Sequence, residues 1–239
     1  MRLTGFRVLT VVALVFGLAL IGATASRADD GDSQLMDTSH QVSDISKKIA
    51  ELTAKGQFAK SGKLAAAADC GFGDPSQTFS AWGDSANYSL APQGDYVDTS
   101  GWSFKNTGPI SSDPNPLGSN ALSFFKGDSE AISPAMCVSV DNPTIRLMMK
   151  DVGGNGKADI KVTVLYEDVN GHTQHLTLAK LKASSSWSPT IAIPIAVNVL
   201  STASSSGWTA VAFDFKVEGL QKDESLELGS LYVDPFVSR

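Results

Sequence analysis

Aromatic side chains are the residues of this chain best suited to contact a ligand. Trp82, Tyr88 and Trp208 lie in or near segments rich in glycine and serine. An exposed indole or phenol ring offers a flat face on which a sugar ring can stack, while nearby polar side chains read the hydroxyl groups. These three residues are therefore the predicted ligand-binding candidates, with burial against a loop as the alternative for each.

The segment Asp151-Val-Gly-Gly-Asn-Gly-Lys-Ala-Asp159 has part of the spacing of a calcium-binding loop. Oxygen-bearing side chains occupy its first, fifth and ninth positions, and a glycine occupies the sixth. The third and twelfth positions, which need an oxygen ligand and a bidentate acid, hold Gly153 and Val162. We therefore predict that this segment is a hairpin turn joining a strand over 144–150 to one over 159–167.

A second hairpin is predicted around Asn170-Gly171, a dipeptide typical of tight turns. Apolar and polar residues alternate over 159–167, which indicates a strand, and another β-prone run follows over 173–181. A two-residue loop would place His175 opposite Tyr166. A four-residue loop would place His175 opposite Val164.

No recognisable catalytic motif is present. His172 and His175 are three residues apart, so on a strand they lie on opposite faces and do not share a metal ion. No serine stands in a Gly-x-Ser-x-Gly turn, which leaves a hydrolase triad without its nucleophile. Glycoside hydrolysis needs two carboxyl groups on facing walls of a cleft, and acids on a solvated strand face are commonplace. The acids available for such a pair are Glu167, Asp168, Asp214, Glu218 and Glu227. We predict that the chain is not an enzyme.

Residues 1–25 have the composition of a secretory signal peptide. Arg2 and Arg7 give a positive amino end, an apolar run follows over 8–21, and Ala23-Thr24-Ala25 offers a small-x-small cleavage site. Ala28 is the alternative cleavage position. Because the apolar run falls short of the ~20 residues that span a bilayer, the mature chain is expected to be secreted and to have no membrane span.

Residues 26–69 are predicted to form a helical, partly disordered extension. Val42, Ile45, Ile49 and Leu52 recur at helical spacing, and five lysines between positions 41 and 64 make the segment locally basic. It either contacts an anionic envelope polymer or a partner helix, or serves as a solvated spacer. The chain as a whole has a net charge of −6, which argues against a duplex nucleic-acid partner.

Cys70 and Cys137 are the only two cysteines. In an oxidising compartment such a pair favours a disulfide, and neither residue has a Cys-x-x-Cys companion or a nearby histidine for redox or metal chemistry. We therefore predict a bridge between them. By chain entropy its long loop would contribute roughly 4 kcal/mol to stability.

Residues 70–239 are predicted to form an all-β domain. Short β-prone runs alternate with turn signals, and Pro194 limits the 195–200 segment to a short loop helix. Many short strands without intervening helices indicate an antiparallel β-sandwich. The expected strands are 87–90, 102–106, 121–125, 135–140, 144–150, 159–167, 173–181, 190–194, 209–217 and 225–233.

An ordered set of sequence blocks resembles the jelly-roll fold of carbohydrate-binding modules. It resembles more closely a group of small secreted bacterial proteins of unknown function with a galactose-binding-like jelly roll. The resemblance covers about 170 residues. It implies an antiparallel jelly roll, with Trp102 and Trp187 in the core. The blocks are Leu90–Trp102, Ala121–Phe125, Ser133–Val138, Ser186–Thr190, Thr209–Phe215 and Leu228–Phe236.

The resemblance also implies a structural calcium site, from which this chain departs. Gly229 and Ser230 stand where such modules have an Asp-Asp pair, and Val97 stands near the place of the opening glutamate. Asp98 and Asp234 are the remaining candidates for metal ligands. No cofactor is otherwise expected.

Together these features predict a secreted jelly-roll β-sandwich with a short helical amino-terminal extension. Its expected role is non-catalytic binding of a glycan or cell-envelope surface. A structural or protein-interaction module of the envelope is the alternative, and a small polysaccharide-acting enzyme is a third hypothesis.

Overall fold

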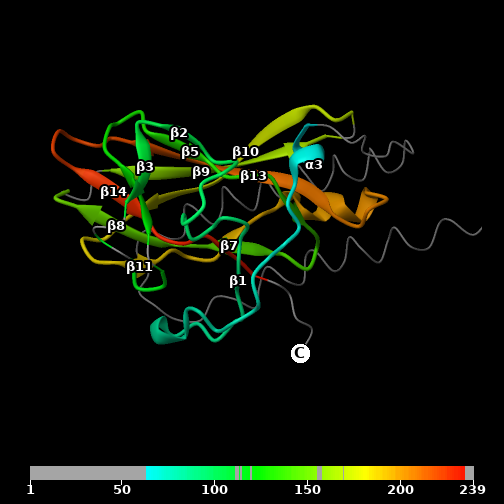
Figure 1. Ribbon diagram of the computed structural model, residues 1–239, viewed down its shortest axis with the longest axis horizontal. Helices are drawn as coiled ribbons and strands as arrows, with labels where there is room; N and C mark the ends of the chain where they lie inside the picture. Colours follow the sequence, from blue (N-terminus) through cyan, green and yellow to red (C-terminus); the bar gives the residue numbers. More distant parts are fainter. Residues whose placement is uncertain are drawn as a thin grey trace, which may run out of the picture. The chain divides into compact units, whose positions relative to one another are not determined.

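The computed structural model describes residues 63–110, 113, 115–118, 120–154, 158–168 and 170–234. The predicted signal peptide and most of the predicted extension lie outside these residues. Within them the strands form two layers of antiparallel pairs (Figure 1), which confirms the predicted β-sandwich. No helix in this part of the chain is long and apolar enough to cross a membrane.

One layer, called here the long sheet, contains the longest strands of the described chain. Its strand order is β10-β9-β13-β5-β2, and β6 pairs with the start of β13 while β5 pairs with its later part. The strands are β2 (Ser103–Lys105), β5 (Glu130–Ile132), β6 (Met136–Val138), β9 (Asp159–Glu167), β10 (Thr173–Lys182) and β13 (Thr209–Glu218).

Alternation along β9 and β13 separates a core face from an outer face of the long sheet. Ile160, Val162 and Val164 of β9 are fully buried. The apolar residues Phe213, Phe215 and Val217 of β13 are likewise fully buried. Successive strand residues point to opposite faces, so the polar residues between them lie on the outer face.

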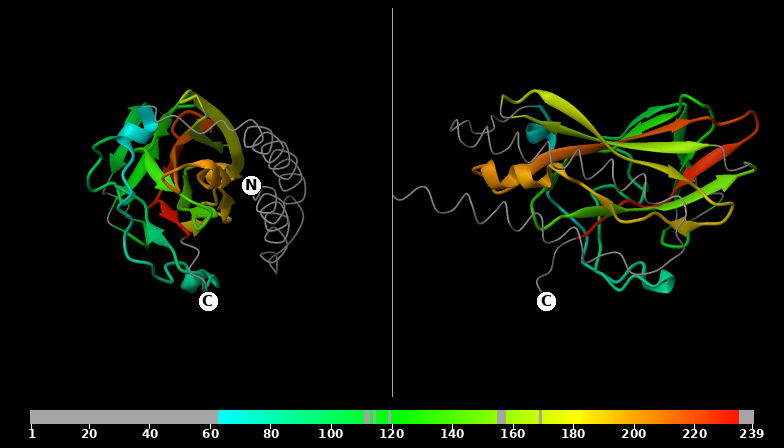
Figure 2. Two further views of the ribbon diagram at one scale, coloured as in Figure 1. Left: turned by 90° about the vertical axis from the view of Figure 1, so that its right-hand side faces the viewer. Right: turned by 180° about the vertical axis from the view of Figure 1, so that it is seen from behind.

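The other layer, called here the interrupted layer, consists of two short sheets with strand orders β1-β15-β7-β12 and β11-β8-β14-β4-β3. One continuous stretch of chain contributes a strand to each of the two sheets. It forms β7 in the first sheet and β8 in the second, and Leu147 separates these two strands. Figure 2 shows this layer opposite the long strands when the molecule is seen from behind. Its strands are β1 (Ser89–Leu90), β3 (Thr107–Ile110), β4 (Ala121–Phe124), β7 (Thr144–Arg146), β8 (Met148–Val152), β11 (Ser188–Pro189), β12 (Ile193–Pro194), β14 (Ser225–Leu228) and β15 (Tyr232–Val233).

The predicted hairpin over Asp151–Asp159 is wrong. Strand β8 pairs with β11 and β14, whereas β9 pairs with β10 and β13. The two strands therefore lie in different layers. A turn-rich sequence indicates a change of direction, but it does not indicate whether the chain returns along the same sheet or crosses to the opposite one.

The β9–β10 hairpin is present, with a register between the two predicted alternatives and a loop longer than either. Thr173 pairs with Glu167, so the loop has five residues and His175 lies opposite Leu165. The Asp168 carboxylate organises this loop, since its Oδ1 accepts hydrogen bonds from the backbone N–H of Asn170 (2.8 Å) and of His172 (3.0 Å). A side chain that caps a loop selects a length that the turn dipeptide alone does not specify.

Helical structure among the described residues is limited to short segments. Helix α3 (Lys63–Ala67) lies within the predicted extension, and the 3₁₀ helices η1 (Ser80–Trp82) and η2 (Val197–Ala203) lie in loops. The predicted disulfide is confirmed, with a Cα–Cα distance of 4.9 Å between Cys70 and Cys137. It joins the segment after α3 to β6.

Replacing Gly229 with alanine is expected to reduce the free energy of unfolding by about 1–3 kcal/mol. A Cβ at this position would lie 2.7 Å from Asn115 Cβ and 2.9 Å from Met148 Cβ, so the packing must shift. Gly108→Ala is the matched control, because a Cβ there meets nothing within 4 Å. Urea denaturation of the two variants measures the difference. Equal stability of both variants would contradict this packing.

Candidate functional site

The three predicted aromatic residues lie in different surroundings. Trp82 is 37% exposed at the end of η1, and Trp208 is half-buried just before β13. Tyr88 is only 2% exposed and donates a hydrogen bond from its hydroxyl to Asp84 Oδ2 at 2.8 Å. Burial, reinforced by the Asp84 carboxylate, raises the pKa of the Tyr88 hydroxyl. Of the three, only Trp82 presents a substantially exposed ring.

Tyr88 belongs to a cluster that covers the outer face of the interrupted layer. Phe79, Tyr88, Met148 and Tyr232 pack together, with the ring of Phe79 edge-on to the Tyr88 ring at 4.9 Å. The Arg146 guanidinium lies 4.8 Å from the centroid of the Phe79 ring and forms an ion pair with Asp84. Loop residues therefore cover this part of the layer, and little strand surface is left for a ligand.

A second group on the same outer face contains two acids. Glu227 lies opposite Lys150, while Asp113 forms an ion pair with Lys150 and hydrogen-bonds to Glu227. Burial, followed by the charge of Asp113, raises the pKa of Glu227 to about 7. Glycosidase carboxyl groups stand ~5 to 9.5 Å apart, with the substrate between them. Two acids that share a hydrogen bond, one of them only 5% exposed, do not form such a cleft.

The candidate metal ligands do not converge on a site. Asp98 is exposed, and its two oxygens accept hydrogen bonds from the backbone N–H and the hydroxyl of Ser100 at 2.8 and 2.9 Å. Asp234 Oδ2 accepts a hydrogen bond from the Thr144 hydroxyl at 3.4 Å. Within the described ranges, no three His, Cys, Asp or Glu side chains lie close enough to hold a metal ion.

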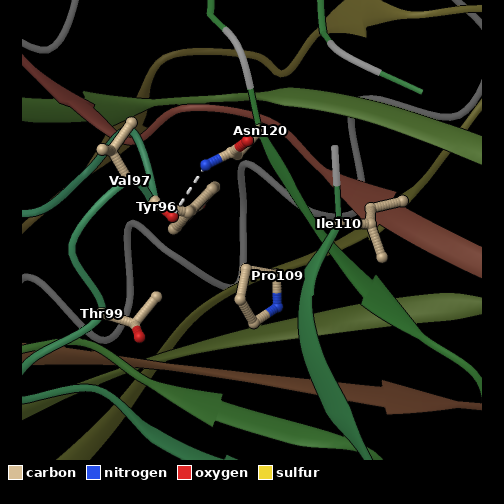
Figure 3. A pocket seen from close by; sticks show the side chains of 6 residues that line it. All are labelled: Tyr96, Val97, Thr99, Pro109, Ile110 and Asn120. Atoms are coloured by element: carbon tan, nitrogen blue, oxygen red, sulfur yellow. Dashed lines mark hydrogen bonds between the residues drawn. The ribbon is translucent and has the colours of Figure 1, made fainter. Parts of the chain in front are cut away.

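A hollow of about 250 Å³ lies between the 96–99 loop and β3 (Figure 3). Tyr96, Val97, Thr99, Pro109, Ile110 and Asn120 line it. The Asn120 amide donates a hydrogen bond to the Tyr96 carbonyl at 3.0 Å, and this bond holds two of its walls together. The Tyr96 ring itself is buried. Its lining combines three aliphatic residues with Tyr96, Thr99 and Asn120, and none of these six residues is charged.

The outer face of the long sheet is a broader surface. Cross-strand register aligns Lys180, Lys161 and Lys216 from three neighbouring strands. The next row consists of Thr177, Thr163 and Asp214. We call these six residues the open face. Five are half-exposed or exposed, and Thr163, although mostly buried, lies between exposed Thr177 and half-exposed Asp214.

The open face carries both positively and negatively charged side chains. Lys180 forms ion pairs with Asp159 (3.3 Å) and Glu218 (3.0 Å), while Lys161 and Lys216 form none with the described residues. Burial raises the pKa of Asp214, and the Glu130 carboxylate adds to this shift. The positive charges of Lys161, Lys216 and His175 partly offset it. The result is a polar face with two unpaired ammonium groups and hydroxyl groups beside them.

Reasoning from the sequence did not identify this face. The alternation of apolar and polar residues over β9 and β13 does predict that Lys161 and Lys216 lie on the outer face of their strands, away from the core. Their juxtaposition depends on the pairing of β9 with β13, which are separated by the whole of β10 and its following loops. No local pattern reveals that register.

No protein-family model matches the chain, and no curated protein matches its sequence. Solved structures with a similar fold include the CBM22-1 xylan-binding domain of Paenibacillus barcinonensis Xyn10C. It is 15% identical and aligns over 61% of this chain and 92% of that domain, with a TM-score of 0.38. The family 11 carbohydrate-binding module of the Clostridium thermocellum cellulase Lic26A-Cel5E is 11% identical over 63% and 95% of the two chains, with a TM-score of 0.41.

The matches also include parts of enzymes. The enzymatically active domain of bacteriophage CBA120 tailspike protein 4 is 10% identical and aligns over 60% of this chain and 21% of that one, with a TM-score of 0.40. The similarity in all these cases is one of fold. The strand pairing of the chain itself establishes its antiparallel β-sandwich.

Proposed function

We propose that the mature chain is a secreted, non-catalytic module that binds a glycan or cell-envelope surface across the open face. The observation that supports this proposal is the contrast between the two outer faces. Loops and an aromatic cluster cover much of the interrupted layer, whereas the polar side chains of the open face, except that of Thr163, are exposed or half-exposed. A flat strand face suits an extended polymer, because successive units can lie along it without entering a cavity.

The chemistry of the open face also fits a polyhydroxylated ligand. Thr163 and Thr177 face each other across β9 and β10, and a threonine hydroxyl both donates and accepts hydrogen bonds. Asp214 adds a carboxylate, and one of its oxygens, Oδ1, is buried with no hydrogen-bond partner among the described residues. Neighbouring donors and acceptors of this kind are the groups with which proteins recognise sugar hydroxyls.

Catalysis finds less support than binding. Asp113 and Glu227, which share a hydrogen bond, lack the separation of a glycosidase pair. A protein-interaction role through the amino-terminal extension remains the alternative if no glycan binds.

A glycan-array screen followed by calorimetry is the test. The mature protein is expected to bind a subset of glycans, and the double variant Thr163→Val/Thr177→Val to bind them about tenfold more weakly, because two hydroxyl hydrogen bonds are lost. Valine keeps the shape and favours strands, so the fold should persist. Thr202→Val, an exposed threonine on η2, is the matched control and should bind like the parent. Absence of glycan binding, or equal binding by the double variant, would reject the proposal.

A further inference from the structure

The open face contains an arrangement of lysines that fold stability does not explain. Lys180, Lys161 and Lys216 occupy directly opposed positions on three adjacent strands. Neighbouring strands are ~4.8 Å apart, and like charges placed directly opposite each other destabilise a sheet. A protein with a net charge of −6 thus holds three ammonium groups in one row.

Among the residues that the structure describes, only one of the three lysines has carboxylate partners in ion-pair contact. Lys180 lies between Asp159 and Glu218, with ion-pair distances of 3.3 and 3.0 Å. Lys161 and Lys216 form no ion pair with any described residue, although Glu130 follows Lys216 in the same row. The three lysines all lower the pKa of Glu218, and the hydrogen bond from Lys180 is the largest cause. The positive potential of the row therefore extends to its neighbours.

Protection of a sheet edge does not account for the row. Lysines on edge strands commonly prevent edge-to-edge aggregation, and this explains Lys180 on β10. Strands β9 and β13 are internal, each with neighbours on both sides, so Lys161 and Lys216 protect no edge.

We infer that the open face binds an anionic glycan, whose carboxylate or sulfate groups contact Lys161 and Lys216 while its hydroxyl groups contact the threonine row. This inference rests on the proposed function and narrows its ligand class. Ammonium groups are compact point charges that bind such anions with charge-assisted hydrogen bonds. The Thr163–Thr177 pair lies two residues along β9, and three along β10 across a bulge, from the Lys161–Lys180 pair, so a single polymer can contact both rows.

Two matched pairs of polymers test the inference by calorimetry with the mature protein. One pair is polygalacturonate and its methyl ester, and the other is dextran sulfate and dextran. The charged member of at least one pair is expected to bind tenfold or more tightly than its neutral partner. Which pair responds distinguishes a carboxylate from a sulfate ligand. Binding should weaken as salt rises from 50 to about 300 mM, since salt screens exposed charges.

The double variant Lys161→Gln/Lys216→Gln should bind the charged polymer about tenfold more weakly. Lys126→Gln/Lys222→Gln, which removes the same charge from two exposed loop positions, should leave binding unchanged. Equal losses in both variants would indicate non-specific attraction and overturn the inference. Preference for neutral polymers, or no binding of either charged polymer, would also overturn it. Glycan binding that depends on Thr163 and Thr177 would leave the proposed function standing in either case.

Discussion

Removing the disulfide with the double variant Cys70→Ala/Cys137→Ala should lower the free energy of unfolding by about 4 kcal/mol. The bridge joins residues 67 apart, so its loss releases a long loop in the unfolded chain. It also anchors the segment in which Asp69 N–H donates to the Ala135 carbonyl at 2.9 Å and Cys137 N–H donates to the Asp69 carbonyl at 3.2 Å. Urea denaturation measures the loss, and the melting temperature should fall by roughly 8–16 °C.

The reduced parent protein is the control for the disulfide variant. Reduction with a thiol should lower the melting temperature by a similar amount, and the thiol should leave the double variant unaffected. If the oxidised and reduced parent proteins unfold at the same denaturant concentration, the bridge does not contribute to stability as described.

Replacing Glu227 with glutamine should stabilise the protein at alkaline pH. The folded-state pKa of Glu227, about 7, lies above the ordinary value of 4.5, so the fold favours the protonated acid. The stability from this group is fully present below pH 4.5 and is lost as the pH rises through 7. Glutamine is neutral at every pH and can still donate to Asp113. We expect the variant to gain up to about 3 kcal/mol over the parent at pH 8.5 and little at pH 4.5.

Chemical denaturation between pH 4.5 and 8.5 measures this difference. Asp223→Asn is the control, because Asp223 is exposed and asparagine tolerates its positive φ of 67°. The control should follow the pH dependence of the parent. A Glu227→Gln variant whose stability falls with pH as steeply as that of the parent would show that Glu227 does not titrate near neutrality.

The regular parts of the fold could be predicted from local patterns. Alternation over 159–167 gives the bounds of β9, and the apolar run after Trp208 gives β13 to within one residue. These strands are long, and one face of each is buried, so their periodicity is complete. The disulfide was also predictable, because the chain has only two cysteines and an oxidising compartment favours a bridge between them.

Short strands and long-range register could not be predicted in this way. Strand β3 contains glycine and proline, which are depleted in strands, and it forms because it lies at a sheet edge, where proline is tolerated. Strand β5 has three residues, too few for a period. The lysine row and the Asp113–Glu227 pair join segments that are distant in sequence, so only the folded chain brings them together.

The burial of Tyr88 illustrates the same limit for the binding candidates. A tyrosine between glycine- and serine-rich stretches is typical of an exposed loop. Here Asp84, four residues earlier, accepts a hydrogen bond from the Tyr88 hydroxyl, and Phe79 packs against the Tyr88 ring. Neither contact follows from the local composition, because both depend on the loop folding back over β7 and β8.

Backbone amide shifts in an NMR titration test the central claim most directly. The isotope-labelled mature protein would be titrated with the tightest-binding glycan from the array. The largest shift changes should fall on Lys161, Thr163, Thr177, Lys180 and Lys216, with little change around Trp82 or in the 96–99 loop. Changes confined to Trp82, Trp208 or the hollow beside β3, or no glycan that binds at all, would contradict a binding site on the open face.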